Sequence, residues 1–226
     1  MPHVERYTLN GVRLPSVSTI TGALSKEGLI RWWRKLGFDE CDRQTREAKD
    51  QGTDVATMFE NYRKFKKKPR GLYLKKVLNE WVQWGEGWNG IELVAEPHLV
   101  NTLDNYHGSP DLLFKDGGKW NLGDDKSKKR FADYGLLMNE HAYAMCDKMD
   151  VDGQLVPVPW QTPVQDIWFW TYCPRCGKLH PHHHVFDEKV YHDFLICRAM
   201  HNVNKTALDY FDCNAILLPE HGCEEK

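Results

Sequence analysis

The chain has 226 residues, 41% of them hydrophobic, which is the size of one ordinary domain, or one domain with decorations, around a real core. Its formal net charge of −2 excludes a global field that draws the protein to nucleic acid. No apolar run approaches the length of a membrane span, and the N-terminus lacks the charged-then-apolar order of a signal peptide. Seven scattered cysteines are an odd number, so we expect mostly free thiols and a reducing cytoplasm.

The first elements expected along the chain are a hairpin and the start of a helix. The stretch from Val4 to Val12 predicts a hairpin that turns at Asn10-Gly11, a good two-residue turn signal. The phrase Leu14-Pro15-Ser16-Val17-Ser18-Thr19-Ile20 follows, and a Ser/Thr pair before a helix is a natural N-cap. Because helix N-termini also bind phosphates, Ser18 and Thr19 are candidate phosphate ligands as well as candidate caps.

Several helices are expected between residues 29 and 81. Apolar residues at i, i+3, i+4 and i+7 mark the last of them as amphipathic. The helix that precedes this amphipathic one is expected to end at Pro69, within a strongly basic run from Arg63 to Arg70. Such basic runs are usually solvated faces. The expected stretches are Leu29 to Trp33 ending near Gly37, residues 39–51, Val55 to Tyr62 after Gly52-Thr53, and the helix of Leu74, Val77, Leu78 and Trp81.

The most informative stretch runs from Tyr106 to Arg130 and predicts two short strands around a turn. The first apolar run is Leu112 to Phe114, the turn is Lys115 to Gly118, and the second strand is Lys119 to Asp124. Such a hairpin brings residues before the first strand close to residues at the end of the second.

The expected hairpin therefore places Asp111 at the start of one strand and Asp124 at the end of its partner. Strand positions two apart face the same side, so Lys126 points with Asp124. Two carboxylates repel each other unless a cation lies between them, and hard oxygen ligands suit Mg²⁺ or Mn²⁺. A lysine beside them can hold an attacking water or a developing oxyanion.

The remaining elements alternate between helix and strand. A first core strand is expected before the central hairpin, and a helix, a strand, its hairpin partner and a long helix are expected after it. A Pro- and Gly-rich loop separates the first of these helices from the strand that follows. The ranges are Ile91 to Glu96, Phe131 to Met145, the loop Val151 to Pro163, Gln165 to Tyr172, His182 to Phe186, and Glu188 to about Phe211 with Asp187 as its cap.

The turn Cys173-Pro174-Arg175-Cys176-Gly177 has the shape of a zinc knuckle, in which both thiolates point inward. A tetrahedral zinc ion needs two further ligands, and no second C-x-x-C exists. A structural Zn²⁺ on Cys173 and Cys176, a turn without metal and an iron–sulfur cluster are the three interpretations. The candidates for the further ligands are His180, His182, His184, Cys213 and Cys223.

The central stretch also carries a family resemblance. A lone D-x-K recurs about once by chance in a chain of this length, so the upstream G-S-P-D, the turn and the apolar strand runs carry the argument. With them, residues Gly108, Asp111, Asp124, Lys126 and Ser127 resemble the PD-(D/E)xK nuclease superfamily, in particular its RecB-like and phage exonuclease branch. The phrase L-P-S-V-S-T is similar to the opening of phage exonucleases related to the mitochondrial genome maintenance exonuclease.

This resemblance implies an α/β fold with a mixed central sheet in α-β-β-β-α-β order. Helical decorations would precede the sheet, and a β-hairpin plus a long helix would follow it. The resemblance spans roughly residues 14–200, and with the length of the chain we expect a single nuclease domain over residues 1–226. Its parts would be an N-terminal hairpin with helices in 1–90, a catalytic core in 91–172, and the cysteine turn, hairpin and C-terminal helix in 173–226.

The function implied by the resemblance is a Mg²⁺- or Mn²⁺-dependent DNA exonuclease of phage or bacterial DNA processing or recombination. Asp111, Asp124 and the backbone carbonyl of Asp125 would hold the metal ion, and Lys126 would position or deprotonate the attacking water. DNA is the implied partner, with a single-strand annealing or single-strand-binding protein as a further one. The implied compartment is the cytoplasm of a bacterial or phage-infected cell.

Two departures from the family pattern affect the expected site. Where relatives read G-T-x-[apolar]-H-x-x-x-E, this chain has Ala56 in place of His, and Glu60 lies one turn further on the same face. Glu60 either takes over part of the metal role, directly or through water, or is a surface glutamate. Where relatives read Q-x-x-x-Y near the DNA, this chain has Asn139 and Tyr143, and core packing is the alternative for Tyr143.

The residues that follow the catalytic lysine, Ser127, Lys128, Lys129 and Arg130, are expected to contact the DNA backbone, like Ser18 and Thr19. Two rival functions remain open beside the exonuclease. One is an endonuclease or junction resolvase of the same fold, and the other is a nucleic-acid-binding module on a decayed nuclease fold. Ala56 and Asn139 favour decay, whereas the retained acids and lysine oppose it.

Overall fold

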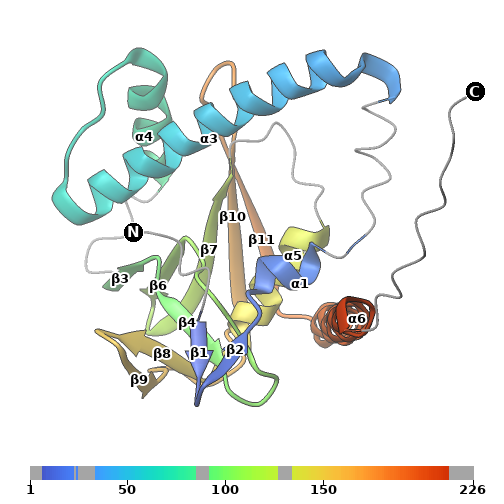
Figure 1. Cartoon of the computed structure of the whole chain (residues 1–226). Coiled ribbons are helices and arrows are strands. Elements are labelled where there is room, and N and C mark those ends of the chain that lie inside the picture. The colour runs from blue at the N-terminus through green and yellow to red at the C-terminus, as the bar shows by residue number, and fades with distance from the viewer. Residues whose placement is uncertain (1–6, 23, 25–33, 85–91, 127–133, 214–226) are drawn as a thin grey trace, which may run out of the picture.

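The structure is a computed structural model that describes residues 7–22, 24, 34–84, 92–126 and 134–213. Its centre is a five-stranded sheet in the order β11-β10-β7-β6-β3, with helices on both sides (Figure 1). The expected mixed α/β class is therefore confirmed. The strands are β3 (Glu92–Ala95), β6 (Leu112–Asp116), β7 (Lys119–Lys126), β10 (Asp166–Tyr172) and β11 (Leu179–Val185).

Antiparallel and parallel pairings are combined in this sheet. Strands β3, β6 and β7 pair antiparallel, β10 joins β7 in parallel, and β11 returns antiparallel to β10. A parallel neighbour requires a crossover connection, and the helix α5 (Tyr134–Ala144) lies in the chain between β7 and β10. In chain order the core is thus helices, three antiparallel strands, one helix and one parallel strand.

The expected central hairpin is confirmed as β6 and β7. Gly117 and Gly118 form its two-residue turn with φ of 53° and 83°, a conformation that glycine adopts without a Cβ penalty. Leu112 pairs with Gly123. The register therefore places Asp111, just before β6, beside Asp124 of β7.

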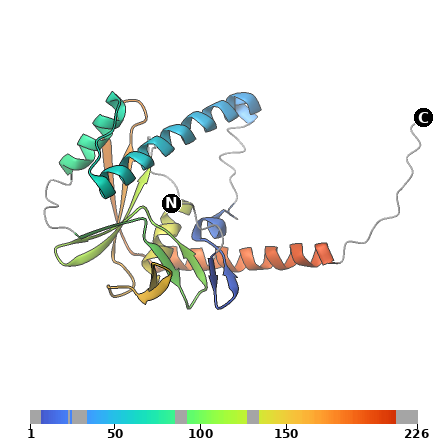
Figure 2. The same cartoon turned by 60° about the vertical axis from the view of Figure 1, so that its left-hand side comes forward.

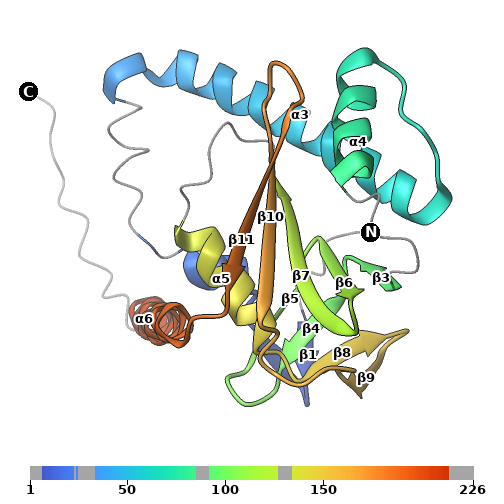
Figure 3. The same ribbon diagram turned by 180° about the vertical axis from the view of Figure 1, so that it is seen from behind.

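The two faces of the sheet carry separate apolar clusters, because successive strand residues point to opposite sides. One cluster joins the sheet to α3 (Phe38–Phe65) and α4 (Leu72–Trp84), and the other joins it to α1 (Val17–Thr21), α5 and α6 (Glu188–Cys213). Figure 3 shows β11 at one edge between these two layers. The strand residues of the α3 side include Leu112, Phe114, Trp170 and Tyr172, and those of the α5 side include Leu113, Leu122, Ile167 and Phe169.

The helix α3 is continuous, so the expected division at Gly52-Thr53 is wrong. One glycine in a helix costs only about 1 kcal/mol relative to alanine, and the burial of Val55, Met58 and Phe59 on the same helix outweighs that cost. The helix closes at Lys66, which has a left-handed φ of 54°, and not at Pro69. The amphipathic prediction for α4 is confirmed, with Val77, Leu78 and Trp81 buried.

A second sheet of four strands, β5-β4-β8-β9, corrects two expectations. Tyr106–Gly108 is not part of the central hairpin but forms β5 on β4 (His98–Asn101). Part of the expected loop 151–163 is β9 (Gln154–Pro157), which pairs with β8 (Lys148–Val151). The turn between them is Asp152-Gly153, with φ of 53° and 85°, a two-residue hairpin signal that the Pro- and Gly-rich composition obscured.

The N-terminal hairpin is confirmed in the described residues as β1 (Tyr7–Leu9) and β2 (Val12–Leu14), turning at Asn10-Gly11. The cap of α1 is Ser16, whose Oγ accepts a hydrogen bond of 3.2 Å from the Thr19 backbone N–H. The expected cap of Ser18 and Thr19 is therefore wrong, since both lie in the first turn of α1. The expected helix from Leu29 to Trp33 lies outside the described residues.

The chain ends in a hairpin and a long helix, as expected. Strand β11 begins at Leu179, earlier than the predicted His182, and Asp187 caps α6 by accepting a 2.8 Å hydrogen bond from the Lys189 backbone N–H. Figure 2 shows α6 running away from the sheet. Of the helices in the described ranges, none has the length and apolar character that a membrane crossing requires.

Gly123 of β7 leaves no room for a side chain. A Cβ there would lie 2.3 Å from Cζ3 of the fully buried Trp170. We expect Gly123→Ala to lower the free energy of unfolding by about 1–3 kcal/mol, because overpacking forces the core to shift. Urea denaturation measures this loss. Gly52→Ala on α3, where a Cβ meets nothing within 4 Å, is the control and should be neutral or stabilising, so equal effects of the two variants would contradict the packing account.

Candidate functional site

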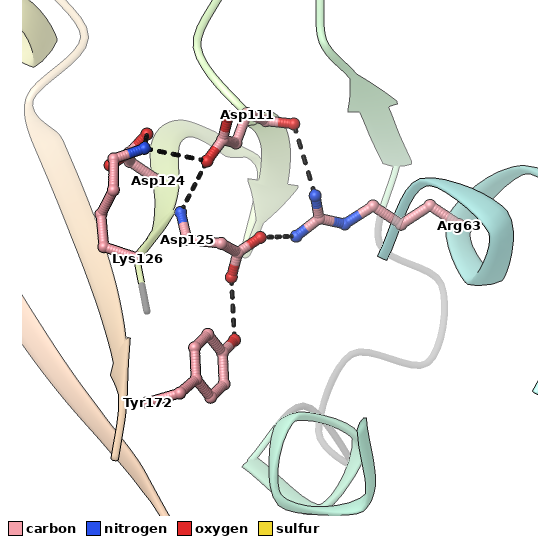
Figure 4. A network of polar contacts seen from close by, with 6 residues as sticks. All are labelled: Arg63, Asp111, Asp124, Asp125, Lys126 and Tyr172. Carbon is pink, nitrogen blue, oxygen red and sulfur yellow. Dashed lines mark hydrogen bonds and ion pairs between the residues drawn. The ribbon is translucent and has the colours of Figure 1, made fainter. Parts of the chain in front are cut away.

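The predicted acids and lysine meet at one end of the β6–β7 hairpin (Figure 4). The Lys126 ammonium donates hydrogen bonds to Asp124 Oδ1 at 2.6 Å and to Asp111 Oδ2 at 3.3 Å. The backbone N–H of Asp125 donates to the same oxygen of Asp111 at 2.9 Å. The structure thus brings together the three side chains that the sequence singled out.

Asp125 points to the opposite face of the sheet, toward α3. Its carboxylate forms an ion pair with Arg63 and accepts a hydrogen bond of 2.9 Å from the Tyr172 hydroxyl (Figure 4). The side chains of Arg63 and Asp125 are only 7% and 5% exposed. The Arg63 guanidinium also donates to the backbone carbonyl of Asp111 at 3.5 Å. Arg63 therefore links α3 to both segments that carry the acids.

The helix α5 adds a fourth acid that sequence reasoning missed. Glu140 is 1% exposed. Within the described part of the chain, two buried carboxylate oxygens lack a hydrogen-bond partner, Asp124 Oδ2 and Glu140 Oε2. Glu140 acts electrostatically on both Asp124 and Lys126, so it belongs to the same cluster. Its signal in the sequence was only its place three residues before Tyr143, on the same side of a helix.

Asp111, Asp124 and Glu140 form the acidic cluster beside Lys126. Burial and like charge determine the protonation of its carboxyl groups. Burial and the Asp111 charge raise the pKa of Asp124 well above its usual range. Burial raises the pKa of Glu140 to about 8, against the opposing effect of Lys126. Partial burial acts to raise the pKa of Asp111, but the Lys126 ammonium and the Asp125 backbone N–H lower it overall.

Lys126 keeps its proton in this setting. Burial alone would lower its pKa, yet the carboxylates of Asp124 and Asp111 outweigh burial and raise it. The ammonium is thus suited to donate hydrogen bonds to a water or to an oxyanion, rather than to remove a proton.

The helix α5 places the two residues of the expected amide–tyrosine pair differently. Asn139 Oδ1 accepts a hydrogen bond of 2.7 Å from the Thr21 hydroxyl, which ties α5 to α1. Tyr143 is buried, and its ring packs on Gly108, where a Cβ would lie 2.6 Å from Cε1. Burial, followed by the charges of Glu140, Asp124 and Asp111, raises the pKa of Tyr143 well above its usual range. Tyr143 is therefore both a packing residue and a neighbour of the acids.

The helix α3 contributes Arg63 on the other face of the sheet, where it pairs with Asp125. Ala56 is exposed and Glu60 is half-buried, and the α3 side chain paired with Asp125 is Arg63. Arg63 lies three residues beyond Glu60 and seven beyond Ala56, so all three share one helix face. That spacing is the available signal in the sequence, but Arg63 also begins the basic run to Arg70, and such runs are usually solvated. A metal role of Glu60 remains a prediction.

Besides Asn139 and Tyr143, the candidate DNA ligands fall into two groups. Ser18 and Thr19 are exposed on α1, and Thr19 Oγ1 lies 2.7 Å from Ser16 Oγ. Thr19 lines a pocket of about 440 Å³ beside α6, together with Arg13 and Arg198. The others, Ser127, Lys128, Lys129 and Arg130, lie outside the described residues.

The donor set of the acidic cluster suits a hard divalent cation. Carboxylate oxygens are the ligands that Mg²⁺ and Mn²⁺ prefer, and two of these oxygens are buried without a hydrogen-bond partner among the described residues. The Lys126 ammonium lies between Asp111 and Asp124 in this structure. Over the described ranges, no three His, Cys, Asp or Glu side chains are already spaced as a complete metal site.

The cysteine turn, Cys173 to Gly177, does not form a complete metal site among the described residues either. Cys173 and Cys176 are not joined in a disulfide, and the described residues supply no group of three ligands around them. The turn is ordered by hydrogen bonds from the Gly177 N–H to the Cys173 carbonyl at 2.8 Å and from the Cys173 N–H to the Lys178 carbonyl at 3.0 Å. The predicted zinc ion therefore has no described third ligand in this structure.

Comparison with known proteins places the fold. No family model and no curated protein matches the chain. Among solved structures, the chain is similar to LHK-Exo in complex with dAMP, with a TM-score of 0.50 and 11% identity over 89% of this chain and 93% of that one. An alkaline exonuclease (LHK-Exo) from Laribacter hongkongensis gives a TM-score of 0.44 and 10% identity over 88% and 92%. The likeness to the first of these structures supports a shared α/β fold.

Proposed function

We propose that this chain is a Mg²⁺- or Mn²⁺-dependent deoxyribonuclease that hydrolyses DNA from its ends. The observation that carries the proposal is the acidic cluster at the end of β6 and β7. The Lys126 ammonium pairs there with Asp111 and Asp124, and the buried Glu140 acts on it electrostatically. Buried carboxylates without hydrogen-bond partners are costly unless a cation neutralises them, and two oxygens of the cluster are in that position among the described residues.

The fold supports the same proposal. When the strands of the second sheet are left out, the chain runs α4, β3, β6, β7, α5, β10, which is compatible with the α-β-β-β-α-β order that the PD-(D/E)xK resemblance implies. The similar solved structure is named LHK-Exo and holds dAMP, a deoxynucleotide, which supports DNA as the substrate class. On this proposal residues 1–226 form one nuclease domain, active in phage or bacterial DNA processing in the cytoplasm. A single-strand annealing or single-strand-binding protein would then receive the remaining strand.

The roles of the residues follow from their positions. Asp111 and Asp124, with the backbone carbonyl of Asp125, would hold the cation, which when bound supplies charge neutralisation at the phosphate. Lys126 orients the attacking water and stabilises negative charge by donating hydrogen bonds. The water oxygen bonds to phosphorus as one phosphorus–oxygen ester bond breaks. The attacking water gives up one proton to the solvent, and the leaving oxygen takes up one proton from the solvent. Arg63 fixes the side chain of Asp125, and the backbone N–H of Asp125 then keeps its hydrogen bond to the Asp111 carboxylate.

End-labelled linear duplex DNA and a covalently closed plasmid test the proposal together. We expect labelled nucleotides from the linear DNA with Mn²⁺ or Mg²⁺, no release in excess EDTA, and an intact closed circle, because an exonuclease needs an end. Cutting of the closed circle would show that the protein is an endonuclease and would contradict the proposed exonuclease activity. If the protein binds DNA but does not cleave it with any divalent metal ion, the alternative function, a nucleic-acid-binding module on a nuclease fold, is supported instead.

A further inference from the structure

We infer that Glu140 of α5 is a third carboxylate ligand of the divalent cation, beside Asp111 and Asp124. The inference rests on the proposed function and extends it, because the family pattern assigns no acid at this position and places the additional ligand on the helix of Ala56 instead. Three features of the structure carry it: the burial of Glu140, the charge balance of the cluster, and the orientation of α5.

The first feature is burial, because a buried carboxyl group without a hydrogen-bond partner is energetically costly. Glu140 is 1% exposed, and its Oε2 has no hydrogen-bond partner among the described residues. Glutamate is almost never fully buried unless it is paired or binds a metal ion. If this position only filled space in the core, leucine or methionine would do so without the desolvation cost of a carboxyl group. The placement therefore indicates that Glu140 meets a cation in the working protein.

The charge balance indicates what kind of cation. Arg63 forms an ion pair with Asp125 on the α3 side of the sheet, so these two charges compensate each other. On the α5 side, Asp111, Asp124 and Glu140 bring three negative charges when ionised, against one positive charge on Lys126. The difference is −2, which one divalent cation cancels. Such a cation would compete with the Lys126 ammonium for the same oxygens.

The orientation of α5 places Glu140 on the same side of the sheet as the two aspartates, which feel its charge. Glu140 and Tyr143 are three residues apart and share one face of the helix. The Tyr143 ring packs on Gly108, three residues before Asp111, so this face is turned toward the acids. The helix α3, by contrast, places the Arg63 guanidinium on Asp125 at the other face of the sheet, and Ala56 is exposed. The third acidic group at the site thus comes from α5.

Calorimetric titration of the full chain with MnCl₂, without DNA, tests this inference. We expect Glu140→Gln to weaken Mn²⁺ binding at least about tenfold, since the amide keeps the size but loses the charge of the ligand. Glu80→Gln on α4 is the matched control, because it makes the same chemical change on a half-buried helical glutamate outside the cluster, and it should leave binding unchanged. An unaltered Mn²⁺ affinity in Glu140→Gln, or an equal loss in both variants, would overturn the inference.

Asp124→Asn separates this inference from the proposed function. If Asp124→Asn abolishes Mn²⁺ binding and Glu140→Gln does not weaken it, only the role of Glu140 fails. If Asp124→Asn also binds Mn²⁺ as the wild type does, the cluster is not the metal site and the proposed function fails with it. Thermal melting of Glu140→Gln serves as the folding control. Its melting temperature should not fall, because glutamine has nearly the same size and carries no charge that burial would penalise.

Discussion

Asp124→Asn is expected to reduce release of labelled nucleotides from linear DNA by roughly three orders of magnitude or more. Asp124 is nearly buried and both faces the expected cation and holds the Lys126 ammonium at 2.6 Å. An amide in its place loses the charge that serves both contacts. Cleavage rates at saturating Mn²⁺ measure the effect, and DNA binding in Ca²⁺ should persist.

Asp166→Asn is the matched control for this prediction. Asp166 lies at the start of β10 and pairs with His183 at 2.8 Å, outside the acidic cluster. The same Asp-to-Asn change there should leave cleavage at the wild-type level. Full activity of Asp124→Asn, or wild-type activity in excess EDTA, would contradict the assigned mechanism.

Asp124→Asn should also change how stability depends on pH in the presence of EDTA. Burial and the Asp111 charge raise the folded-state pKa of Asp124, so the folded protein holds this proton more tightly than the unfolded chain. Stability from this group is present below the unfolded pKa of about 3.9 and is lost as pH rises toward the folded value. The asparagine variant should lose less stability over that range, which separates loss of activity from loss of the fold.

Arg63→Met is expected to lower the free energy of unfolding by about 3–5 kcal/mol, because it leaves the Asp125 carboxylate buried without its partner. Arg63 and Asp125 are 7% and 5% exposed, so water cannot replace the lost charge. The guanidinium also packs on the rings of Phe59 and Trp81, at 5.0 and 5.3 Å from their centroids. Urea denaturation at neutral pH measures the loss.

Two variants distinguish the buried charge from other effects of removing Arg63. The double variant Arg63→Met with Asp125→Asn removes both charges and should regain most of the stability. Arg43→Met breaks an exposed pair with Glu40 on the same helix and should leave stability close to the wild type. A double variant no more stable than Arg63→Met alone would show that packing, and not the ion pair, carries the contribution of Arg63.

Local signals in the sequence determined the parts of the molecule that depend on neighbouring residues. The Asn10-Gly11 and Gly117-Gly118 turns set two hairpins, because both central positions of such turns need positive φ. The apolar periodicity predicted α4, and strand alternation placed Asp124 and Lys126 on one side. The group of Asp111, Asp124 and Lys126 was therefore predictable from a 16-residue stretch.

The second sheet shows where local signals stop. Strand β8 pairs with β4, and the paired residues Val100 and Lys148 are 48 positions apart in the chain. Such pairings depend on which edges the rest of the fold leaves open, and no turn signal reports this. Likewise, α3 continues through Gly52 because its buried face continues, a property of the partner surface on the sheet.

Only the tertiary structure placed Arg63 and Glu140 at the site. Arg63 is 62 residues from Asp125, and its role follows from how α3 crosses the sheet, which leaves its guanidinium buried against the carboxylate. Glu140 reads as an ordinary helical glutamate until α5 packs on β7 and removes it from water. Burial turns an unremarkable charge into one that must be compensated, and burial is decided by packing between distant segments rather than by the residues on either side.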